Sequence, residues 1–297
     1  MINNCKILLI FAVCLVSIKP EEFTYQQAIT GCDALNLKIQ KPEADGRVQT
    51  LNKKGAVTAR FAYIEREFLK FGTGKKIMEI GGCYGDVMLH ALKQSMATQY
   101  VLSDLDRRHL FIAAKKLAEK IQKNWLKPDS VNQVHFVEAD ITNADHVKNF
   151  DQYEAILVAR VLHFFTPEQL ELTVKHLFLL LKPGGRVFVI AITPYVKRFQ
   201  KFIPEYERRV KAGEKYPGFV KSLRDYVDAD VTTPAQIKNL HGEPFLFLDV
   251  NTLREVFVHN GFNILECHTI PLNYQSISWS YDGRENVILI AQKEKAS

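Results

Sequence analysis

A glycine-bearing turn is the first segment of the chain whose residue types could do chemistry. Gly81-Gly82-Cys83-Tyr84-Gly85 follows an apolar run and precedes an amphipathic stretch. A turn of this kind lets the backbone approach a ligand closely, and the helix that follows offers N–H groups to a polar or anionic group. Alone the turn is a weak signal, because glycine loops also occur for purely structural reasons.

Two acidic residues further along the chain make the signal for a particular kind of ligand more specific. Asp104 lies nineteen residues beyond Gly85 and ends the apolar run Val101-Leu102-Ser103, and Asp140 follows the run that ends in Val137-Glu138-Ala139. A carboxylate at the first position can accept both hydroxyl hydrogens of a ribose, and one at the second can accept from an adenine amino group. Each acid alone could equally cap a helix. The loop and the two acids in this order favour a nucleoside site.

The segments around these residues must form a sheet that holds them. From about residue 75, short apolar runs alternate with amphipathic stretches, which predicts parallel strands joined by helices. The carboxyl ends of such strands are where open α/β sheets bind ligands. The predicted strands are Lys76–Ile80, Gln99–Ser103, Gln133–Glu138, Glu154–Ala159, Arg186–Ile192, Phe262–Ile270 and Asn286–Gln292, the last two forming an antiparallel pair at the edge.

The intervening helices have readable start and stop signals. Asp106 is a predicted N-cap, and Thr166-Pro167-Glu168-Gln169 combines an N-cap, a first-turn proline and a capping-box glutamine. Lys182-Pro183-Gly184-Gly185 is predicted to end that helix and to turn into the next strand. Further helices are predicted over Ala56–Phe71 and Thr252–Asn260.

These motifs resemble those of class I S-adenosylmethionine-dependent methyltransferases. Glu79-Ile80-Gly81-Gly82-Cys83-Tyr84-Gly85 resembles the family's acid-x-Gly-x-Gly-x-Gly motif, with Cys83 in place of the middle glycine. Tyr153–Phe165, with its Leu162-His163 pair, resembles the fourth-strand region, and Leu179–Arg186 resembles the turn before the fifth strand. The resemblance covers roughly residues 56–192 and 249–293.

The resemblance implies a fold, an activity and a cofactor. The fold is α/β, a Rossmann-like doubly wound, mostly parallel seven-stranded sheet with an antiparallel C-terminal strand pair and a helical lid insertion. The activity is methyl transfer from S-adenosylmethionine. Glu79 is expected to order the loop, Gly81 and Gly85 to cradle the methionine part, Asp104 to hold the ribose, and Asp140 with Ile141 to hold the adenine. The expected cofactor-binding set also includes Gly82, Cys83, Leu105 and Ala159.

Other functions fit the same kind of sheet. A nicotinamide-dependent dehydrogenase needs glycines at the first, third and sixth loop positions, but Cys83 and Asp86 occupy the third and sixth. An aminopropyltransferase-like enzyme stays open, although no pair of acids is clearly placed for a polyamine. A non-catalytic S-adenosylmethionine-binding protein also stays open.

Methyl transfer from a sulfonium mainly requires alignment of donor and acceptor and exclusion of water, and it needs a base only if the acceptor is protonated. His163 and Arg160 follow the fourth strand and are the candidate catalytic residues. His163 is a base or a histidine that packs under the cofactor, and Arg160 orients an anionic acceptor or pairs with a surface acid. The five cysteines have no metal-ligand spacing, so no metal is expected.

Residues 194–248 interrupt the α/β alternation with a basic and aromatic stretch. The segment from Tyr195 to Arg224 holds nine basic and three acidic residues. Its net charge of +6 equals the net charge of the whole chain. Seven aromatics from Tyr195 to Tyr226 form either an apolar wall of the acceptor pocket or a core of the insertion. We expect the methyl acceptor to be a small molecule. The positive charge of this segment allows the acceptor to be anionic and to interact with Arg208 and Arg209. Protein or lipid methylation comes next, and no nucleic-acid partner is expected because no RNA-binding module is recognisable.

The N-terminus leaves the location open. The apolar residues 7–18 can be a cleaved signal, an uncleaved anchor that contacts a membrane, or a buried helix. A cytoplasmic protein with free thiols is expected, with export or membrane association as the alternative; the oligomeric state stays open. The expected divisions are an apolar segment (1–20), a helical extension (21–74), the cofactor-binding core (75–193), the lid insertion (194–248) and the remainder of the core (249–297).

Overall fold

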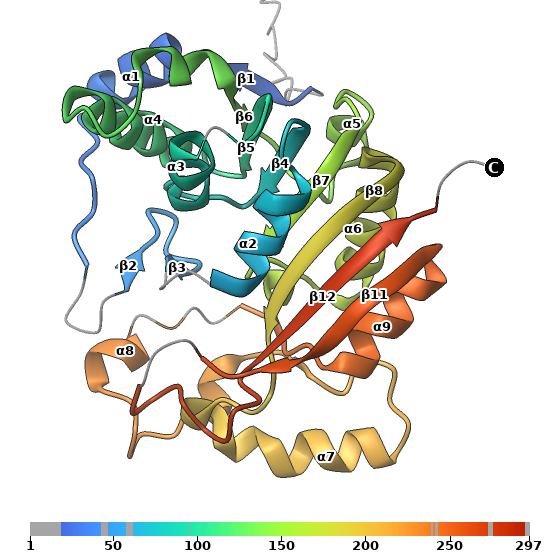
Figure 1. Ribbon diagram of the computed structural model, residues 1–297. Helices are drawn as coiled ribbons and strands as arrows, with labels where there is room; N and C mark the ends of the chain where they lie inside the picture. The colour runs from blue at the N-terminus through green and yellow to red at the C-terminus, as the bar shows by residue number, and fades with distance from the viewer. Residues whose placement is uncertain are drawn as a thin grey trace, which may run out of the picture.

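The computed structural model describes residues 19–42, 47–57, 62–94, 96–238, 240, 243–272 and 276–294 (Figure 1). The apolar residues 7–18 therefore lie outside the described residues. Among the helices in the described ranges, none is both long enough and apolar enough to span a membrane. The central feature is an eight-stranded sheet, which in spatial order consists of β1 (Glu21–Phe23), β6 (Val134–Glu138), β5 (Gln99–Asp104), β4 (Lys76–Ile80), β7 (Tyr153–Ala159), β8 (Leu181–Ile192), β12 (Asn286–Lys293) and β11 (Phe262–Ile270).

The sheet has the predicted mostly parallel arrangement. β6, β5, β4, β7 and β8 are parallel neighbours, and β12 runs antiparallel between β8 and β11. The chain order reverses on either side of β4, which places a topological switch point at its carboxyl end. All seven predicted strands are present. β1 is an additional strand, antiparallel to β6, and its three residues are too few to give an alternating pattern in the sequence.

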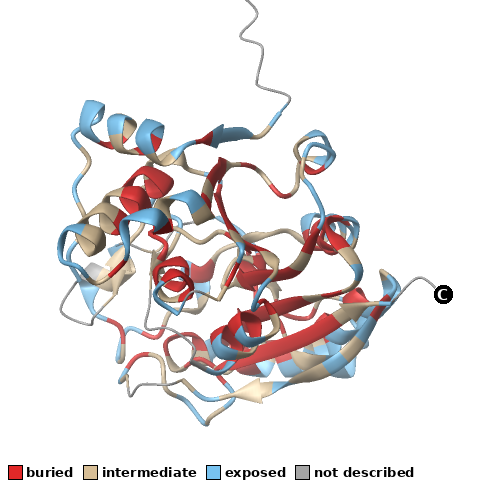
Figure 2. Ribbon diagram, turned by 45° about the horizontal axis from the view of Figure 1, so that its top comes forward, coloured by how far each residue is buried: buried red, intermediate tan, exposed pale blue. Residues whose placement is uncertain are grey.

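Helices cover both faces of the sheet, as the doubly wound prediction requires. One layer contains α1 (Tyr25–Ala34), α2 (Ala62–Phe71), α3 (Asp86–Lys93) and α4 (Arg107–Gln122), and the other contains α5 (Ala144–Val147), α6 (Pro167–Leu180) and α9 (Val250–His259). Alternate residues of one strand face opposite sides of a sheet. In β8, Phe188 and Ile190 accordingly pack under the first layer, while Val187 and Val189 pack under the second. Figure 2 shows these central strands buried between the exposed outer surfaces of the helices.

Most predicted helix boundaries are confirmed. Asp106 caps α4 through a hydrogen bond from Arg108 N, and Thr166 forms a capping box with Gln169 at the start of α6. The helix predicted over Ala56–Phe71 is wrong in its first part. Ala56–Val57 is strand β3, which pairs with β2 (Val48–Gln49) in a short hairpin, and α2 begins at Ala62. The preceding segment supplies a pairing partner, which periodicity within residues 56–71 does not reveal.

The segment after β8 forms a small core of its own. It contains the 3₁₀ helices η3 (Lys197–Phe202) and η4 (Leu223–Tyr226), the helices α7 (Ile203–Lys211) and α8 (Pro234–Lys238), and the strand pair β9 (Phe219–Val220) and β10 (Phe245–Leu246). Phe202, Tyr206 and Phe247 are buried together in this core. β10 contacts the 3₁₀ helix η2 (Leu162–Phe164), which follows β7. The insertion therefore lies over the strand ends of the sheet, in the lower part of Figure 1.

Candidate active site

A cavity of about 630 Å³ opens at the carboxyl ends of the central strands. Its lining includes residues that directly follow β4, β5, β6 and β7, together with parts of the β2–β3 hairpin and of the insertion. This volume lies within the usual range for small-molecule sites, roughly 300–1,000 Å³. Parallel strands whose carboxyl ends meet at a switch point place their following residues around one space, so the cavity collects residues that are far apart in sequence.

The loop between β4 and α3 is held tightly against its neighbours. Gly81 N–H and Gly82 N–H both donate to the carbonyl oxygen of Ser103, at 2.8 and 3.1 Å. Gly81 has φ +68°, and a Cβ there would lie 2.4 Å from a methyl carbon of Val161. A Cβ on Gly82 would lie 2.2 Å from a methyl carbon of Leu102. The two glycines therefore let the backbone itself form the wall of the cavity.

Gly85 lies apart from the cavity and has a packing role, while its implied role in cradling the cofactor stays a prediction. It is the only predicted cofactor-binding residue that does not line the cavity. It precedes α3 in a left-handed conformation, and a Cβ there would lie 2.9 Å from Met88 Cε and 3.0 Å from Ala113 Cβ. Close packing of α3 against α4 thus requires the glycine. Ala159, at the end of β7, does line the cavity as predicted.

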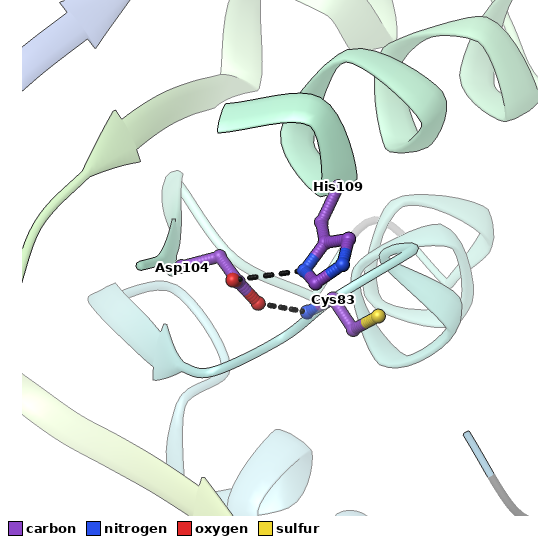
Figure 3. Close-up of side chains that lie close together, drawn as sticks. All are labelled: Cys83, Asp104 and His109. Carbon is purple, nitrogen blue, oxygen red and sulfur yellow. Dashed lines mark hydrogen bonds and ion pairs between the residues drawn. The ribbon is translucent and has the colours of Figure 1, made fainter. Parts of the chain in front are cut away.

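Asp104 ends β5 and joins three parts of the site (Figure 3). Its side chain is buried, with the residue 7% exposed. Oδ2 accepts from Cys83 N at 2.9 Å, and Oδ1 accepts from Asp106 N and from His109 Nδ1, each at 3.0 Å. Each carboxylate oxygen can accept two hydrogen bonds. Oδ2 therefore retains one acceptor position towards the expected ribose, and the other bonds hold the glycine loop in place.

His109 is a site residue that the sequence analysis missed. It lies in the first turn of α4, is 1% exposed and lines the cavity. Its Nδ1 donates to Asp104, and its Nε2 accepts from the backbone N–H of Leu51 at 3.1 Å. Tyr84 OH donates to Gln49 O at 3.0 Å. These bonds tie the β2–β3 hairpin to the cofactor loop, although that segment lies outside the motifs.

Cys83, Asp104 and His109 also place a sulfur, an oxygen and a nitrogen within 4.8 Å of one another. Three such atoms are a minimal ligand set for a transition metal. Both nitrogens of His109 and both oxygens of Asp104 already take part in hydrogen bonds with the protein. Burial also raises the pKa of the Cys83 thiol, which disfavours the thiolate that binds metals. We therefore assign the cluster to ordering the loop.

Glu79 lies at the base of the loop and is buried, with 4% of its surface exposed. Its Oε2 accepts from Tyr100 OH at 2.6 Å, and a Cβ on Gly82 would lie 2.8 Å from its Cδ, so Glu79 lies close beneath the loop. Burial raises the pKa of Glu79 to about 8, and the charge of Glu65 acts in the same direction. Glu65, from α2, also lines the cavity and was not predicted. A cationic ligand at this point would meet two buried acids.

The raised pKa of Glu79 predicts how stability depends on pH. The unfolded chain ionises this residue near pH 4.5, whereas the folded chain keeps it neutral up to about pH 8. The contribution of Glu79 to the free energy of unfolding is therefore fully present below pH 4.5 and is lost as the pH rises through 8. In the absence of cofactor, we compare the melting temperature of Glu79→Gln with that of the wild type at each pH. The difference, variant minus wild type, should rise by about 2–6 °C when the pH is raised from 5 to 8.5. Tyr100→Phe, which keeps the carboxyl group, is the control, and parallel pH curves for wild type and Glu79→Gln would contradict the assignment.

The predicted adenine end of the cavity is built around Asp140. Its Oδ1 accepts from Thr142 N at 2.8 Å and from Thr142 Oγ1 at 2.7 Å, and within the described ranges no hydrogen bond reaches Oδ2. Ile141 is buried, and its carbonyl oxygen lies 2.7 Å from His176 Nδ1. Leu105 lines the cavity although it is 54% exposed. The arrangement offers one carboxylate oxygen and two apolar side chains to a flat ring.

Arg160 follows β7 and lines the cavity. It has φ +58°, a left-handed conformation that is uncommon for a residue with a side chain and that often occurs at functional sites. Its backbone N–H donates to Ile190 O at 2.8 Å, and its Nη2 donates to Asn286 Oδ1 at 3.4 Å. These contacts with β8 and β12 hold the residue at the cavity edge. Its role in orienting an acceptor stays a prediction.

His163 lies in η2, is 3% exposed and also lines the cavity. Its ring centroid is 4.2 Å from that of Phe164 and 4.8 Å from that of Phe245, which belongs to the insertion. The aromatic contacts fit the packing interpretation, and the position on the lining fits a base. Both interpretations of His163 stay predictions.

Of the two interpretations of the aromatics in the insertion, the structure favours a core of the insertion over a wall of the cavity. Of its seven aromatics between Tyr195 and Tyr226, only Phe199 lines the cavity. Arg208 and Arg209 do not line it either, because both lie on α7 and pair with Glu205 at 2.8 and 2.9 Å. The cavity lining thus gives no support to the expectation that these two arginines serve an acceptor, which stays a prediction. The cation that does line the cavity from this segment is Arg198, which the sequence analysis did not single out.

Comparisons with known proteins agree with this architecture. Residues 78–187 match the family model of a methyltransferase domain. No curated protein sequence matches the chain. An S-adenosylmethionine-dependent methyltransferase from Methanosarcina mazei is similar, with 13% identity, a TM-score of 0.55, and coverage of 80% of this chain and 100% of that chain.

Two further solved structures cover different shares of their own chains. A putative methyltransferase from Haloferax volcanii, solved in complex with a methyltransferase activator, has 11% identity and a TM-score of 0.50, over 78% of this chain and 90% of that chain. An O-methyltransferase family protein from Burkholderia thailandensis has 16% identity and a TM-score of 0.48, over 79% of this chain and 55% of that chain. At these identities the likeness to the Methanosarcina mazei and Haloferax volcanii structures concerns the fold alone.

Proposed function

We propose that this chain, whose residues 78–187 match the family model of a methyltransferase domain, is a class I S-adenosylmethionine-dependent methyltransferase and that its methyl acceptor is a small molecule. The observation that carries the proposal is the cover over the cavity. The β2–β3 hairpin and the insertion both line it, and an ion pair of 3.2 Å joins Lys54 of the hairpin to Glu243 of the insertion. An acceptor enclosed beneath both segments has to be small, which favours a metabolite over a protein or a lipid surface.

The residues of the cavity fit the cofactor. S-adenosylmethionine carries a positively charged sulfur and an ammonium group, and Glu65 and Glu79 are buried acids on the lining; Glu79 is neutral in the empty cavity, and a cation bound beside it would favour its ionised form. Asp104 and Asp140 each have an oxygen with acceptor capacity for hydroxyl and amino hydrogens. The close approach at Gly81 and Gly82 leaves the space in which a methionine chain would lie. The polar groups of the lining and the shape of the backbone therefore both fit S-adenosylmethionine.

When bound, S-adenosylmethionine would supply a methyl group on a sulfonium, whose transfer to the acceptor would leave the electron pair of the broken carbon–sulfur bond on sulfur. The residues of this chain then have to align the acceptor and exclude water. The hairpin and the insertion exclude water by covering the cavity. Arg160 and His163 line the cavity and would orient the acceptor, and His163 would take up a proton if the attacking atom carries one.

Two measurements test this function. Isothermal titration of the full chain should show binding of S-adenosylhomocysteine and none of NAD, because the loop lacks two glycines that a dinucleotide needs. A metabolite extract incubated with the enzyme and methyl-labelled S-adenosylmethionine should then yield a labelled compound of low molecular mass. Label found only in protein or lipid fractions would overturn the proposal of a small-molecule acceptor. Binding of NAD without S-adenosylhomocysteine would contradict the cofactor.

A further inference from the structure

The β2–β3 hairpin covers the cavity without a core of its own. It contributes to the lining from Arg47 to Val57, yet none of the residues 47–57 is buried. Its two strands have two residues each. An element that buries so little apolar surface opens at a low cost in free energy unless specific bonds hold it in place. Individual contacts therefore decide how firmly the hairpin stays over the cavity.

On the side of the insertion, the hairpin is joined by an exposed ion pair. Lys54 Nζ lies 3.2 Å from Glu243 Oε2, and the two side chains are 46% and 57% exposed. Such pairs contribute little, because water and salt screen them. A Cβ on Gly55 would lie 3.0 Å from Phe164 Cζ, so the tip of the hairpin also rests against the segment after β7. These contacts position the tip, but the ion pair alone would not keep the hairpin closed.

On the side of the cofactor loop, two buried side chains bond to the backbone of the hairpin. His109 Nε2 accepts from Leu51 N at 3.1 Å, and Tyr84 OH donates to Gln49 O at 3.0 Å. Both side chains are almost completely buried, and their rings pack edge to face with centroids 5.4 Å apart. A buried polar group that loses its partner is costly. Opening the hairpin has to break both of these bonds.

Asp104 sets the tautomer of His109. Because Nε2 accepts from a backbone N–H, the proton of the ring lies on Nδ1, which donates to Asp104 Oδ1 at 3.0 Å (Figure 3). Asp106 Oδ2 lies 3.9 Å from Nε2, which is too far for a hydrogen bond. The carboxylate that is expected to hold the ribose therefore also orients the ring that holds the hairpin.

From these contacts we propose that His109 and Tyr84 are positioning residues that hold the β2–β3 hairpin over the bound cofactor and thereby limit how fast the cofactor enters and leaves. The proposal rests on the proposed function, because the covered ligand is the cofactor of that reaction. Each turnover requires S-adenosylhomocysteine to leave before the next S-adenosylmethionine binds, and in many enzymes the opening of a cover limits turnover. Tyr84 does not line the cavity, so it acts through the hairpin.

The experiment measures the association and dissociation rates of S-adenosylhomocysteine with the full chain, by stopped-flow mixing and by displacement of labelled ligand. Tyr84→Phe removes one bond to the hairpin, keeps the ring, and changes no residue of the cavity lining. Both rates should rise by about three- to ten-fold, which corresponds to the net contribution of one hydrogen bond. The hairpin opens before entry as well as before exit, so the dissociation constant should change less than either rate.

Two variants of His109 separate its two bonds. His109→Asn places an amide N–H near the position of Nδ1 and keeps a donor for Asp104, but it has no acceptor for Leu51 N. His109→Gln places a carbonyl oxygen near the position of Nε2 and keeps that acceptor. The asparagine variant should therefore exchange cofactor faster than the glutamine variant. Hydrogen exchange of residues 47–57 in the unliganded chain should follow the same order.

Tyr206→Phe is the matched control. Tyr206 OH also donates a hydrogen bond of 3.0 Å, to Asp249 Oδ2, but Tyr206 belongs to the core of the insertion and does not line the cavity. This variant should leave both rates unchanged.

Three results would overturn the inference. They are wild-type rates in Tyr84→Phe and His109→Asn, equal acceleration in Tyr206→Phe, and faster dissociation matched by an equal loss of affinity, which marks a direct contact with the ligand. Failure of the proposed function looks different. If the wild-type chain does not bind S-adenosylhomocysteine, the function and the inference are both wrong. If it binds and the variants behave like the wild type, only the inference is wrong.

Discussion

Replacing Asp104 with alanine should weaken the binding of S-adenosylhomocysteine by about a hundred-fold or more and should also lower the melting temperature. The carboxylate accepts hydrogen bonds from Cys83 N, Asp106 N and His109 Nδ1, and Oδ2 has capacity for a ribose hydroxyl. Bonds to a charged acceptor contribute about 1.5–3 kcal/mol each, and about 1.4 kcal/mol corresponds to a ten-fold change in affinity. Loss of the ribose bond together with a loosened loop reaches about 3 kcal/mol. Calorimetry and thermal melting measure the two effects.

Asp106→Ala is the matched control for this prediction. Asp106 is a carboxylate on the same turn, but it caps α4 and does not line the cavity. Loss of the cap should cost about 0.5–2 kcal/mol of stability, while affinity for the cofactor changes little. If Asp104→Ala behaves like Asp106→Ala, Asp104 is a structural residue and the ribose lies elsewhere.

The second large effect is expected at Gly81. Alanine there would adopt φ +68° and place its Cβ 2.4 Å from Val161 Cγ2, at the wall of the cavity. The left-handed conformation costs on the order of 1 kcal/mol, and the overlap must be relieved by a shift of the loop or of Val161. Because both line the cavity, a shift of either changes its shape. We expect cofactor affinity to fall at least ten-fold and methyl transfer to fall at least as far.

The variant Gly74→Ala separates the effect of backbone strain from the effect of a changed cavity shape. Gly74 has nearly the same backbone conformation, φ +71°, but a Cβ there would meet no atom within 4 Å. It lies before β4 and is absent from the cavity lining. Both variants should lose a similar amount of stability from the backbone alone, and only Gly81→Ala should lose cofactor binding. Equal binding by both would mean that the loop tolerates a side chain and does not contact the ligand closely.

Residues at the strand ends could be predicted from the sequence because their positions follow from local rules. The alternation of apolar runs and amphipathic stretches indicates parallel strands, and parallel strands bring their carboxyl ends to one edge. Asp104, Asp140 and Arg160 therefore reach one cavity once their strands are identified. Gly85 shows the limit of a motif, since a glycine needed for packing against α4 looks the same in sequence as one needed for a ligand.

Contacts between distant segments were decided only by the tertiary structure. His109 lies 58 residues from Leu51, and no spacing in the sequence links them; the β2–β3 hairpin has to fold over the loop before Nε2 finds its donor. Arg198 and Arg208 belong to one mixed-charge stretch, yet the first is 2% exposed on the cavity wall and the second pairs with Glu205 on α7. The sequence by itself determined the sheet, the glycine loop and the order of the acids, because these depend on periodicity and on chain direction. The tertiary structure decided which cations line the cavity and which segments cover it, because side-chain burial depends on packing between elements that have no local relation in the chain.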